Sequence, residues 1–307
     1  MTSALYFIET ITPLHAGSGR GIGLIDLPIT RDVVTGDPNL RGSACRGVLR
    51  DYFENNPELT TEAEKLFGPK TIHSEADAFD GSLSVNDARL IVMPVRSMNG
   101  TQAWVTCARV LNAFRREARL MGVRAGMPDD APEPSRDSGI ICGATTETSL
   151  LFGRTVTLED FTLDAETDVG KFGAAHTQRN EWCDYLCGIF WPSEEDEPWR
   201  ISFSKRFAIV SDNVFSHFEE YATDVRARVR LDESRVVVKG ALWNEENLPA
   251  GSLLAGVITA QKTRKVTQPA EVIERLPRAA LMQFGGKFSV GRGAARFIVP
   301  GEVQHAG

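Results

Sequence analysis

Hydrophobic and polar residues follow two different periods in the first part of the chain. Residues 4–13 are rich in β-branched and aromatic side chains, which predicts a strand. Over 43–55 apolar side chains recur every three or four positions, which predicts a helix with one buried face. The apolar positions of this helix are Cys45, Val48, Leu49, Tyr52 and Phe53. A pair of strands at about 82–96 follows, and then a helix over 108–121 that Gly122 ends.

The later part of the chain predicts a hairpin between two helices. Asp212 is the expected N-cap of a helix over 214–221. Residues 225–231 and 236–243 then alternate as two strands, joined by the polar residues 232–234. The remaining predicted elements are a strand from Ser252, a helix over about 269–282 and a terminal glycine-rich loop.

The order of these elements indicates an α+β fold. Strand, helix, paired strands and helix follow one another as in a ferredoxin-like or RRM-like sheet. The chain of 307 residues is long for one domain but not clearly two, and we expect a single core over 1–307 with insertions. The stretch at about 127–200 is the expected variable insertion, and the hairpin at about 225–250 is expected to protrude.

Composition narrows the function classes. No run of 18 apolar residues and no basic-apolar-small leader is present, so we expect a cytoplasmic protein without a membrane partner. Five scattered cysteines fit reduced core thiols better than a zinc site or a disulfide framework. The net charge of −7 counts against nucleic-acid binding, but arginines gather at 41–50, 109–124 and 226–239, which allows one basic face.

Two segments near the N-terminus suit a phosphate chain. Glycines alternate with other residues over 17–23, so the backbone can approach a bulky partner closely. Ser43 is the expected N-cap of the following helix, whose free N–H groups next to Arg46 can bind phosphate oxygens. Arg50 lies one turn beyond Arg46 on a face away from the core. The expected RNA contacts of these segments are Gly17, Gly19, Arg20, Gly42, Ser43, Arg46, Gly47 and Arg50.

Six motifs occur in an order that resembles one protein family. They are GLIDLPITRD (23–32), RGSACRGVLRD (41–51), KLFGP (65–69), SVNDARLIVMPVRS (84–97), GALWNEENLPAG (240–251) and FGGKFSVGRG (284–293). Together they resemble the backbone subunits of Cmr-type (type III-B) CRISPR effector complexes, a Cas-seven-like group within the RAMP superfamily of RNA-binding proteins. The resemblance spans nearly the whole chain and thins out between about 127 and 200.

The resemblance implies an RNA-guided endoribonuclease built from several copies of the chain. These would stack head to tail on a guide RNA with other Cmr subunits, and would cleave the paired target RNA at regular intervals. The terminal loop would contact the guide RNA, and the hairpin would act as a thumb that wedges between nucleotides. The residues so implied are Gly285, Gly286, Gly291, Arg292 and Gly293 in the loop, with Trp243, Glu245 and Glu246 at the tip and exit of the thumb.

Asp26 is the catalytic residue that the resemblance implies. A carboxylate between Ile25 and Leu27 is costly to bury unpaired, so it must face solvent, an arginine or a ligand. In the family this position is held responsible for target cleavage, through metal-assisted attack of a 2′-hydroxyl on the adjacent phosphate. Asp26 would hold Mg²⁺ or another divalent cation, or orient the hydroxyl. The plainer alternative is a salt bridge to Arg31 or Arg20.

Several interpretations stay open at this point. His15, before the glycine loop, is a possible general acid or base, although a histidine in that place more often stabilises a turn. The terminal loop can be a tight hairpin without a ligand, and Trp243 can simply anchor its own hairpin. Two other functions compete with target cleavage: a non-catalytic filament subunit, and a RAMP endonuclease that processes precursor guide RNA with His15.

Overall fold

One large mixed sheet forms the body of the molecule. The computed structural model describes residues 1–19, 21, 25–71, 79–123 and 126–301. Twelve of the described strands form the sheet, and ten of them follow the order β13-β14-β1-β12-β4-β5-β9-β6-β8-β7, with β2 pairing to β4 and β3 to β12. Most neighbours are antiparallel, whereas β5 and β9, and likewise β6 and β8, are parallel. The sheet strands are β1 (Thr2–Thr10), β2 (Asn39–Leu40), β3 (Leu83–Val85), β4 (Ala88–Arg96), β5 (Gln102–Cys107), β6 (Gly139–Cys142), β7 (Thr155–Leu158), β8 (Phe161–Ala165), β9 (Phe207–Val210), β12 (Leu253–Ala260), β13 (Ala279–Gln283) and β14 (Ala294–Ile298).

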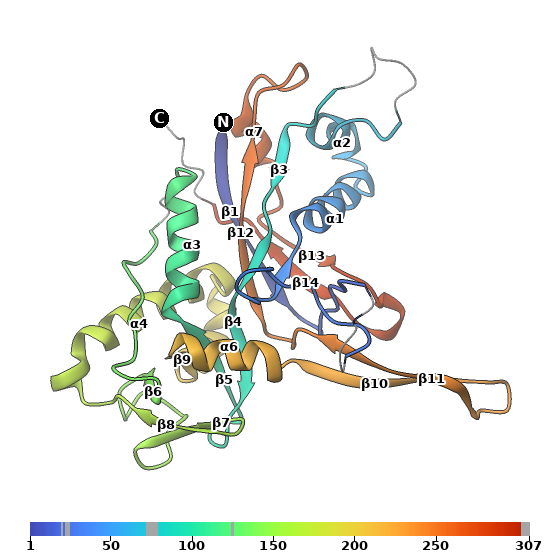
Figure 1. Cartoon of the computed structure of the whole chain (residues 1–307). Coiled ribbons are helices and arrows are strands. Elements are labelled where there is room, and N and C mark those ends of the chain that lie inside the picture. The colour runs from blue at the N-terminus through green and yellow to red at the C-terminus, as the bar shows by residue number, and fades with distance from the viewer. Residues whose placement is uncertain (20, 22–24, 72–78, 124–125, 302–307) are drawn as a thin grey trace.

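Helices cover this sheet, and a two-stranded hairpin leaves it. The helices are α1 (Gly42–Glu54), α2 (Thr60–Phe67), α3 (Ala108–Leu120), α4 (Val169–Phe190), α5 (Glu197–Ser204), α6 (Asp212–Tyr221) and α7 (Pro269–Glu274), with short 3-10 turns η2 (Glu194–Asp196) and η3 (Phe288–Val290). β10 (Asp224–Leu231) and β11 (Val237–Asn247) pair with each other in a separate two-stranded sheet and extend away from the body (Figure 1). We call these two strands and their turn the β10–β11 hairpin.

The local sequence pattern explains the elements nearest the site. In α1 the side chains of Cys45, Leu49 and Phe53 are buried, as the helical period predicts. Gly122, with φ of 79°, follows the C-cap of α3, as expected for a glycine that ends a helix. All five cysteines are free and buried, which agrees with reduced core thiols. No helix among the described residues is long and apolar enough to cross a membrane.

Several sequence expectations were wrong at helix starts. Ser43 is not the N-cap of α1: the helix begins at Gly42, whose N–H is accepted by the Asp87 carboxylate at 2.7 Å. A carboxylate from another segment of the chain therefore occupies the place predicted for phosphate. The N-cap of α6 is Ser211, whose hydroxyl accepts the Val214 N–H, so Asp212 is the first helical residue.

One strand pairing and one helix end also differ from expectation. The residues at about 82–96 form β3 and β4, but both strands pair with β12 rather than with each other. The helix predicted over 269–282 ends at Glu274, and residues 279–283 are strand β13 instead. Pro277 explains this change, because a proline disfavours the helical conformation of the residue before it and cannot donate a helical hydrogen bond.

The stretch at about 127–200 is ordered structure that continues the sheet. Strands β6 and β8 pair with each other, and β6 also pairs with β9 at the edge of the central strands. Helix α4 follows and buries Trp182, Leu186 and Phe190. Arg179 of α4 is buried as well, and its guanidinium donates to the carbonyls of Phe207 and Ser204.

Candidate functional site

Three segments that are far apart in sequence meet at the base of the β10–β11 hairpin. Leu14 and Leu248 exchange two backbone hydrogen bonds of 2.9 Å each. Gly286 N–H donates to the His15 carbonyl at 3.0 Å, and Gly293 N–H donates to Pro13 at 3.0 Å. The residues after the first strand, the end of β11 and the terminal loop 284–293 therefore form one unit.

The segment that carries Asp26 is held against β11 as a short extra strand. Leu27 pairs in parallel with Glu245: its N–H donates to Asn244 O at 3.1 Å, and its carbonyl accepts the Glu246 N–H at 3.0 Å. Asp26 Oδ2 accepts the Asn244 N–H at 2.8 Å. The sequence alone does not reveal Asn244 in this role, because its contribution is a backbone N–H.

The Asp26 carboxylate is exposed, and its second oxygen, Oδ1, has no partner among the described residues. It lines a cavity of about 430 Å³ whose other lining residues are Gly21, Leu27, Gly240, Leu242 and Trp243. The indole of Trp243 is half-buried there, and its Nε1 has no hydrogen-bond partner among the residues that the structure describes. The cavity thus combines a carboxylate oxygen that no described residue contacts with an aromatic surface that can stack on a base.

The salt bridge considered for Asp26 does not form with Arg31. Arg31 pairs instead with Glu246, at 2.6 Å from Oε1, and also donates to the carbonyls of Gly36 and Glu219. Arg20 lies outside the described residues. Glu246 Oε2 accepts the Ile29 N–H at 3.0 Å, so this buried glutamate holds the Asp26 segment from its far end.

His15 is buried, with 6% of its surface exposed, and its Nδ1 lies 2.7 Å from the Glu246 carbonyl oxygen. A Cβ on Gly17 would lie 2.8 Å from His15 Nε2, so the glycine lets the loop pass close to the ring. Such contacts favour the structural interpretation of this histidine over acid–base catalysis.

Of the two places expected for Trp243, Glu245 and Glu246, the tip and the exit of the hairpin, these residues lie at the exit, near the hairpin base. The turn is formed by residues 232–236, where Val236 N–H donates to the Asp232 carboxylate. Trp243, Glu245 and Glu246 are near the other end of β11, and both glutamates are buried. Consecutive polar residues lie between Trp243 and Leu248, where a strand that returns to the core would be expected to alternate with apolar residues. This break in the pattern was the sequence signal for a functional site at the hairpin base.

The terminal loop requires its glycines for close backbone contact. Gly285 has φ of 67°, and a Cβ there would lie 2.3 Å from His15 O. Gly293 has φ of 81°, and a Cβ there would lie 2.0 Å from Phe284 O. Gly286 and Gly291 have no atom within 4 Å of such a Cβ, although Gly291 has φ of 74°. Arg292 is buried and directed toward Glu245, at 3.8 Å.

The predicted arginines of α1 are occupied within the chain. Arg46 donates to Phe67 O at 2.6 Å and lies over the Phe67 ring, 5.6 Å from its centroid. Arg50 donates to Glu54 at 2.8 Å. A Cβ on Gly42 would lie 2.1 Å from Val85 O, so this glycine is explained by packing. These contacts join α1 to its own neighbours rather than to the Asp26 cavity.

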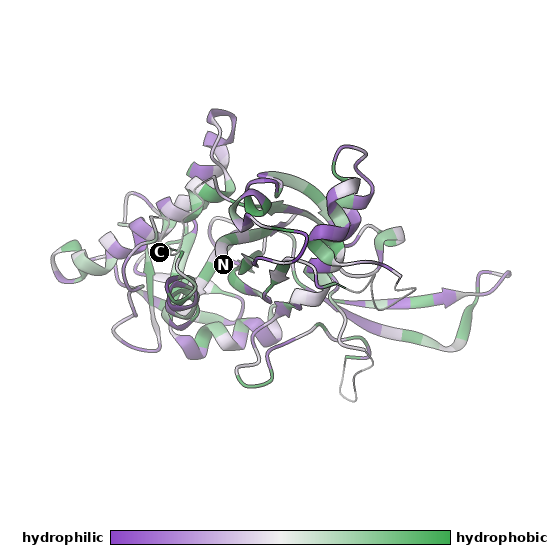
Figure 2. Cartoon of the chain, turned by 90° about the horizontal axis from the view of Figure 1, so that it is seen from above, coloured by the Kyte–Doolittle hydropathy of each residue, from purple (hydrophilic) through white to green (hydrophobic). Residues whose placement is uncertain are grey.

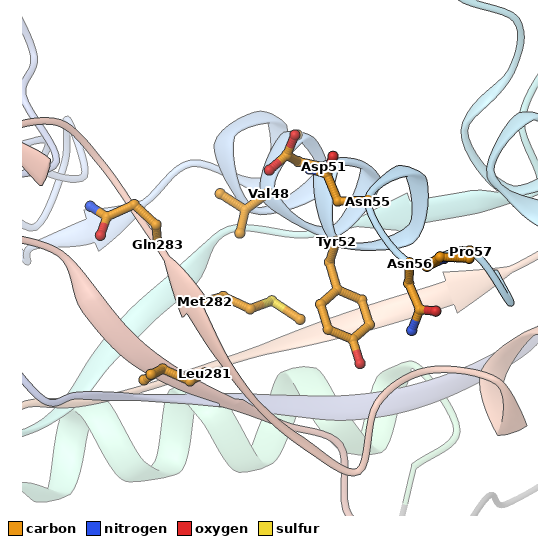
Figure 3. A pocket seen from close by; sticks show the side chains of 10 residues that line it. Val48, Asp51, Tyr52, Asn55, Asn56, Pro57, Leu281, Met282 and Gln283 are labelled. Atoms are coloured by element: carbon orange, nitrogen blue, oxygen red, sulfur yellow. The ribbon is translucent and has the colours of Figure 1, made fainter. Parts of the chain in front are cut away.

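The exposed loop and helix positions carry less information. Ser43, Gly47 and Gly19 are exposed, and Gly19 adopts φ of 107°. Gly47 lines a separate cavity of about 600 Å³ between α1 and β13, where Val48 and Tyr52 face Leu281 and Met282 (Figure 3). This cavity shares no lining residue with the cavity at Asp26.

A largely buried ionic network is connected through Arg31 to Glu246, which holds the Asp26 segment. Arg109 of α3 forms two hydrogen bonds with Asp37, at 2.6 and 2.9 Å, and lies 3.6 Å from Glu219 of α6. Burial, and next the nearby Asp37 carboxylate, raise the pKa of Glu219 to about 9. Arg31 joins this network to Glu246 through the Glu219 carbonyl.

Glu219 should make the free energy of unfolding depend on pH. Because its pKa is higher in the folded state, the folded protein binds the proton more tightly, and stability falls as the pH rises from about 4.3 toward 9. We expect wild type to lose up to about 1.4 kcal/mol per pH unit in this window relative to Glu219→Gln. Urea unfolding at pH 5 and pH 8 measures this loss. The exposed neighbour Glu220→Gln is the control, and equal pH slopes for wild type and Glu219→Gln would contradict the assignment.

A divalent cation can be held at Asp26 only with help from a ligand. No group of three or more His, Cys, Asp or Glu side chains suited to a metal occurs among the described residues. Mg²⁺ is commonly bound by one or two carboxylates together with phosphate oxygens and water, and Asp26 Oδ1, which has no partner among the described residues, fits that arrangement. The residues therefore fit a cation shared between Asp26 and a phosphate.

Comparisons with known proteins find relatives that match nearly the whole chain. The chain is 30% identical over 317 residues to the CRISPR system Cmr endoribonuclease Cmr4 of Pyrococcus furiosus, covering 100% of the chain and 99% of that protein. It is 23% identical to the CRISPR system CMR subunit Cmr4 of Saccharolobus solfataricus, covering 94% of the chain and 93% of the relative.

Solved structures share the fold. The chain superposes on oligomeric Cmr4 from Pyrococcus furiosus with a TM-score of 0.71 at 24% identity, covering 100% of both chains. It superposes equally well, at 0.71 and 18% identity, on a chain of the type III-B Cmr-beta complex bound to cognate target RNA, with 97% of each covered. The family model of the RAMP superfamily matches residues 7–296, and the chain therefore belongs to the RAMP superfamily.

Proposed function

We propose that this protein is a repeating backbone subunit of a type III-B Cmr complex that binds a guide RNA and cleaves the complementary target RNA. The observation that carries the proposal is the exposed Asp26 carboxylate, held by β11 at a cavity beside Trp243, in a chain aligned end to end with a Cmr endoribonuclease. Base pairing with the guide would select the target, and the protein would supply the backbone contacts.

Asp26 is the residue that we assign to the cleavage step. The 2′-oxygen of a target nucleotide attacks the adjacent phosphorus, a bond from phosphorus to that oxygen forms, and the bond to the 5′-oxygen of the next nucleotide breaks. Asp26 Oδ1 orients the 2′-hydroxyl or accepts its proton, while the leaving oxygen takes a proton from water. A divalent cation, when bound, would stabilise negative charge on the phosphate.

The protruding hairpin is proposed to act as a thumb against RNA and a neighbouring copy. Its strands alternate, so Arg226 and Arg228 lie on one face and Val225 and Val229 on the other, with Leu242 opposite Val229. The apolar side chains of Val225, Val229 and Leu242 are 46%, 49% and 64% exposed, respectively. Figure 2 shows hydrophilic and hydrophobic stretches along both strands. Val229 and Leu242 are paired across the two strands, so they form one exposed apolar patch, and a joined patch suits contact with a partner better than single exposed side chains do.

The core is proposed to be ferredoxin-like within a single domain. Elements β1, α1, β4, β5 and α3 give the order of strand, helix, two paired strands and helix, with β2, α2 and β3 inserted among them. The paired strands are β4 and β5 rather than the pair expected at about 82–96. The residues at about 127–200 then extend the same sheet as an insertion. The precursor-processing alternative has less support, because the His15 ring is buried and bonded to a carbonyl.

Stoichiometry tests the proposal directly. The chain is mixed with guide RNAs of increasing length, and the complexes are weighed by native mass spectrometry. A backbone subunit gives a ladder of species separated by one chain mass of 33.7 kDa, and longer guides carry more copies. A constant single copy on every guide would contradict the proposal and would favour a nuclease that acts alone.

A further inference from the structure

The most unusual charged group outside the Asp26 cavity is Glu245. Its side chain is fully buried in β11, and neither carboxylate oxygen has a hydrogen-bond partner among the described residues. An ionised carboxylate is among the costliest groups to bury, and hydrogen bonds normally compensate for the lost water. In Glu245 that compensation can come only from nearby charge.

Three cations surround this carboxylate at distances longer than a hydrogen bond. Arg228 Nε lies 3.9 Å and Lys287 Nζ 3.6 Å from Oε2, and Arg292 Nε lies 3.8 Å from Oε1. Arg228 comes from the hairpin, and the other two come from the terminal loop. Arg226, directly opposite Glu245 in the strand register, is paired with Asp224 at 2.8 Å, and its attraction to Glu245 is weaker than this pairing.

The three cations keep their hydrogen-bond donors free. None of their side chains donates a hydrogen bond to any part of the chain that the structure describes, and Arg292 Nε is buried without a partner. Lys287 and Arg228 are 34% and 29% exposed, so the group opens toward solvent. Lys287 also adopts φ of 68°, a strained conformation for a residue other than glycine, which functional sites often retain.

Charge balance identifies the ligand class. Three positive charges face one negative charge, so an anion is needed to complete the group. We propose that Glu245 is a positioning residue that gathers Arg228, Lys287 and Arg292 into one clamp for an RNA phosphate. The carboxylate does not contact the RNA: it prevents three like charges from spreading apart into solvent, and it leaves their donors available. This inference rests on the proposed function, because it assumes that RNA passes the hairpin base.

Net charge and the proposed clamp predict opposite effects of one substitution on the affinity for RNA. Removing a negative charge from an RNA-binding protein normally strengthens binding to a polyanion, or leaves it unchanged. Glu245→Gln should instead weaken binding of a labelled single-stranded RNA by about tenfold, which corresponds to one charge-assisted hydrogen bond to phosphate. Glu233→Gln, which removes the same charge from the exposed hairpin turn, is the matched control and should bind like wild type or slightly tighter.

Double-variant cycles separate positioning from a purely structural effect. Lys287→Ala should weaken RNA binding several-fold in wild type but hardly at all in the Glu245→Gln background, because the clamp is already dispersed. The salt dependence of binding should become shallower in Glu245→Gln, by roughly 0.7 in logarithmic slope for each phosphate that the variant no longer neutralises. Thermal unfolding of every variant confirms that the compared proteins are folded.

Equal affinity of Glu245→Gln and Glu233→Gln for RNA would overturn the clamp while leaving the proposed function intact. Failure of the wild-type chain to bind RNA would instead remove the proposed function and the clamp with it. If Glu245→Gln does not fold, the variants Arg228→Ala and Lys287→Ala test the clamp instead. Both side chains are partly exposed, so the variants should fold. Each should weaken binding several-fold more than Arg119→Ala, an exposed arginine on α3, and equal losses would refute the clamp.

Discussion

Asp26→Asn should abolish cleavage of target RNA at every backbone position while the complex still assembles. The asparagine side chain keeps its size and an oxygen that can accept the Asn244 N–H, so the short strand at the hairpin base should persist. What disappears is the negative charge that, in the proposed mechanism, holds a cation or takes a proton at the reacting phosphate. A rate loss of at least about a hundredfold follows, since such electrostatic stabilisation is commonly worth several kcal/mol.

Two controls accompany this result: the substitution of another carboxylate, and the removal and return of divalent metal. Asp184→Asn, an exposed change on α4, should cleave like wild type. Removing divalent cations with a chelator should stop wild-type cleavage, and adding Mg²⁺ should restore it. His15→Ala should reduce the rate much less than Asp26→Asn. Normal cutting by a fully assembled complex carrying Asp26→Asn would exclude this carboxylate from the chemistry.

Shortening the hairpin should block assembly without unfolding the chain. Joining Arg228 to Trp243 through an Asn-Gly turn removes residues 229–242 but keeps the register at the base. Of the removed side chains, Val229 and Leu242 are 49% and 64% exposed, so the thermal midpoint should change little. Association between copies should weaken by about a hundredfold, because burying two such side chains is worth roughly 3 kcal/mol.

Sedimentation on a long guide RNA measures this loss of assembly. A chain in which only turn residues 232–234 are replaced by glycines keeps the length of the hairpin and serves as the control. The shortened protein should remain near the size of one or two copies, whereas the control should form the full ladder. An unchanged ladder, or unchanged cleavage positions, would exclude the hairpin from both assembly and spacing.

Local patterns explain which parts of the fold were predictable from sequence. The buried face of α1 and the end of α3 at Gly122 depend on residues within one or two turns, and both predictions were confirmed. The partners of β3 and β4 depend on β12, far along the chain, and no local signal distinguishes that pairing from a simple hairpin. Pro277 was a local signal that the helix predicted over 269–282 ends before this residue.

The candidate site likewise contains residues that the sequence predicts and residues that only tertiary contacts define. Asp26 and the terminal glycines stand out because a lone acid and a glycine run violate the surrounding pattern, whereas the Asn244 N–H has no sequence signature. Arg46 and Arg50 looked available on a helix face, but Arg46 contacts Phe67, a neighbour that periodicity cannot place. Arg50 pairs with Glu54, four residues later in the same helix, and that spacing was visible in the sequence. Tertiary contacts decide which cation is free to bind a ligand and which is already paired.

The pairing of β1 has a consequence for how the protein is made on the ribosome. Both sheet partners of this strand, β12 and β14, are translated long after it: Ser3 and Thr259, bonded across β1 and β12, are 256 residues apart. During elongation the nascent chain therefore carries an apolar strand whose two edges have nothing to pair with. We expect this segment to bind chaperones during synthesis. Until β11 emerges, Asp26 also lacks the backbone that orients it, so an unfinished chain has not assembled the cleavage site that we propose.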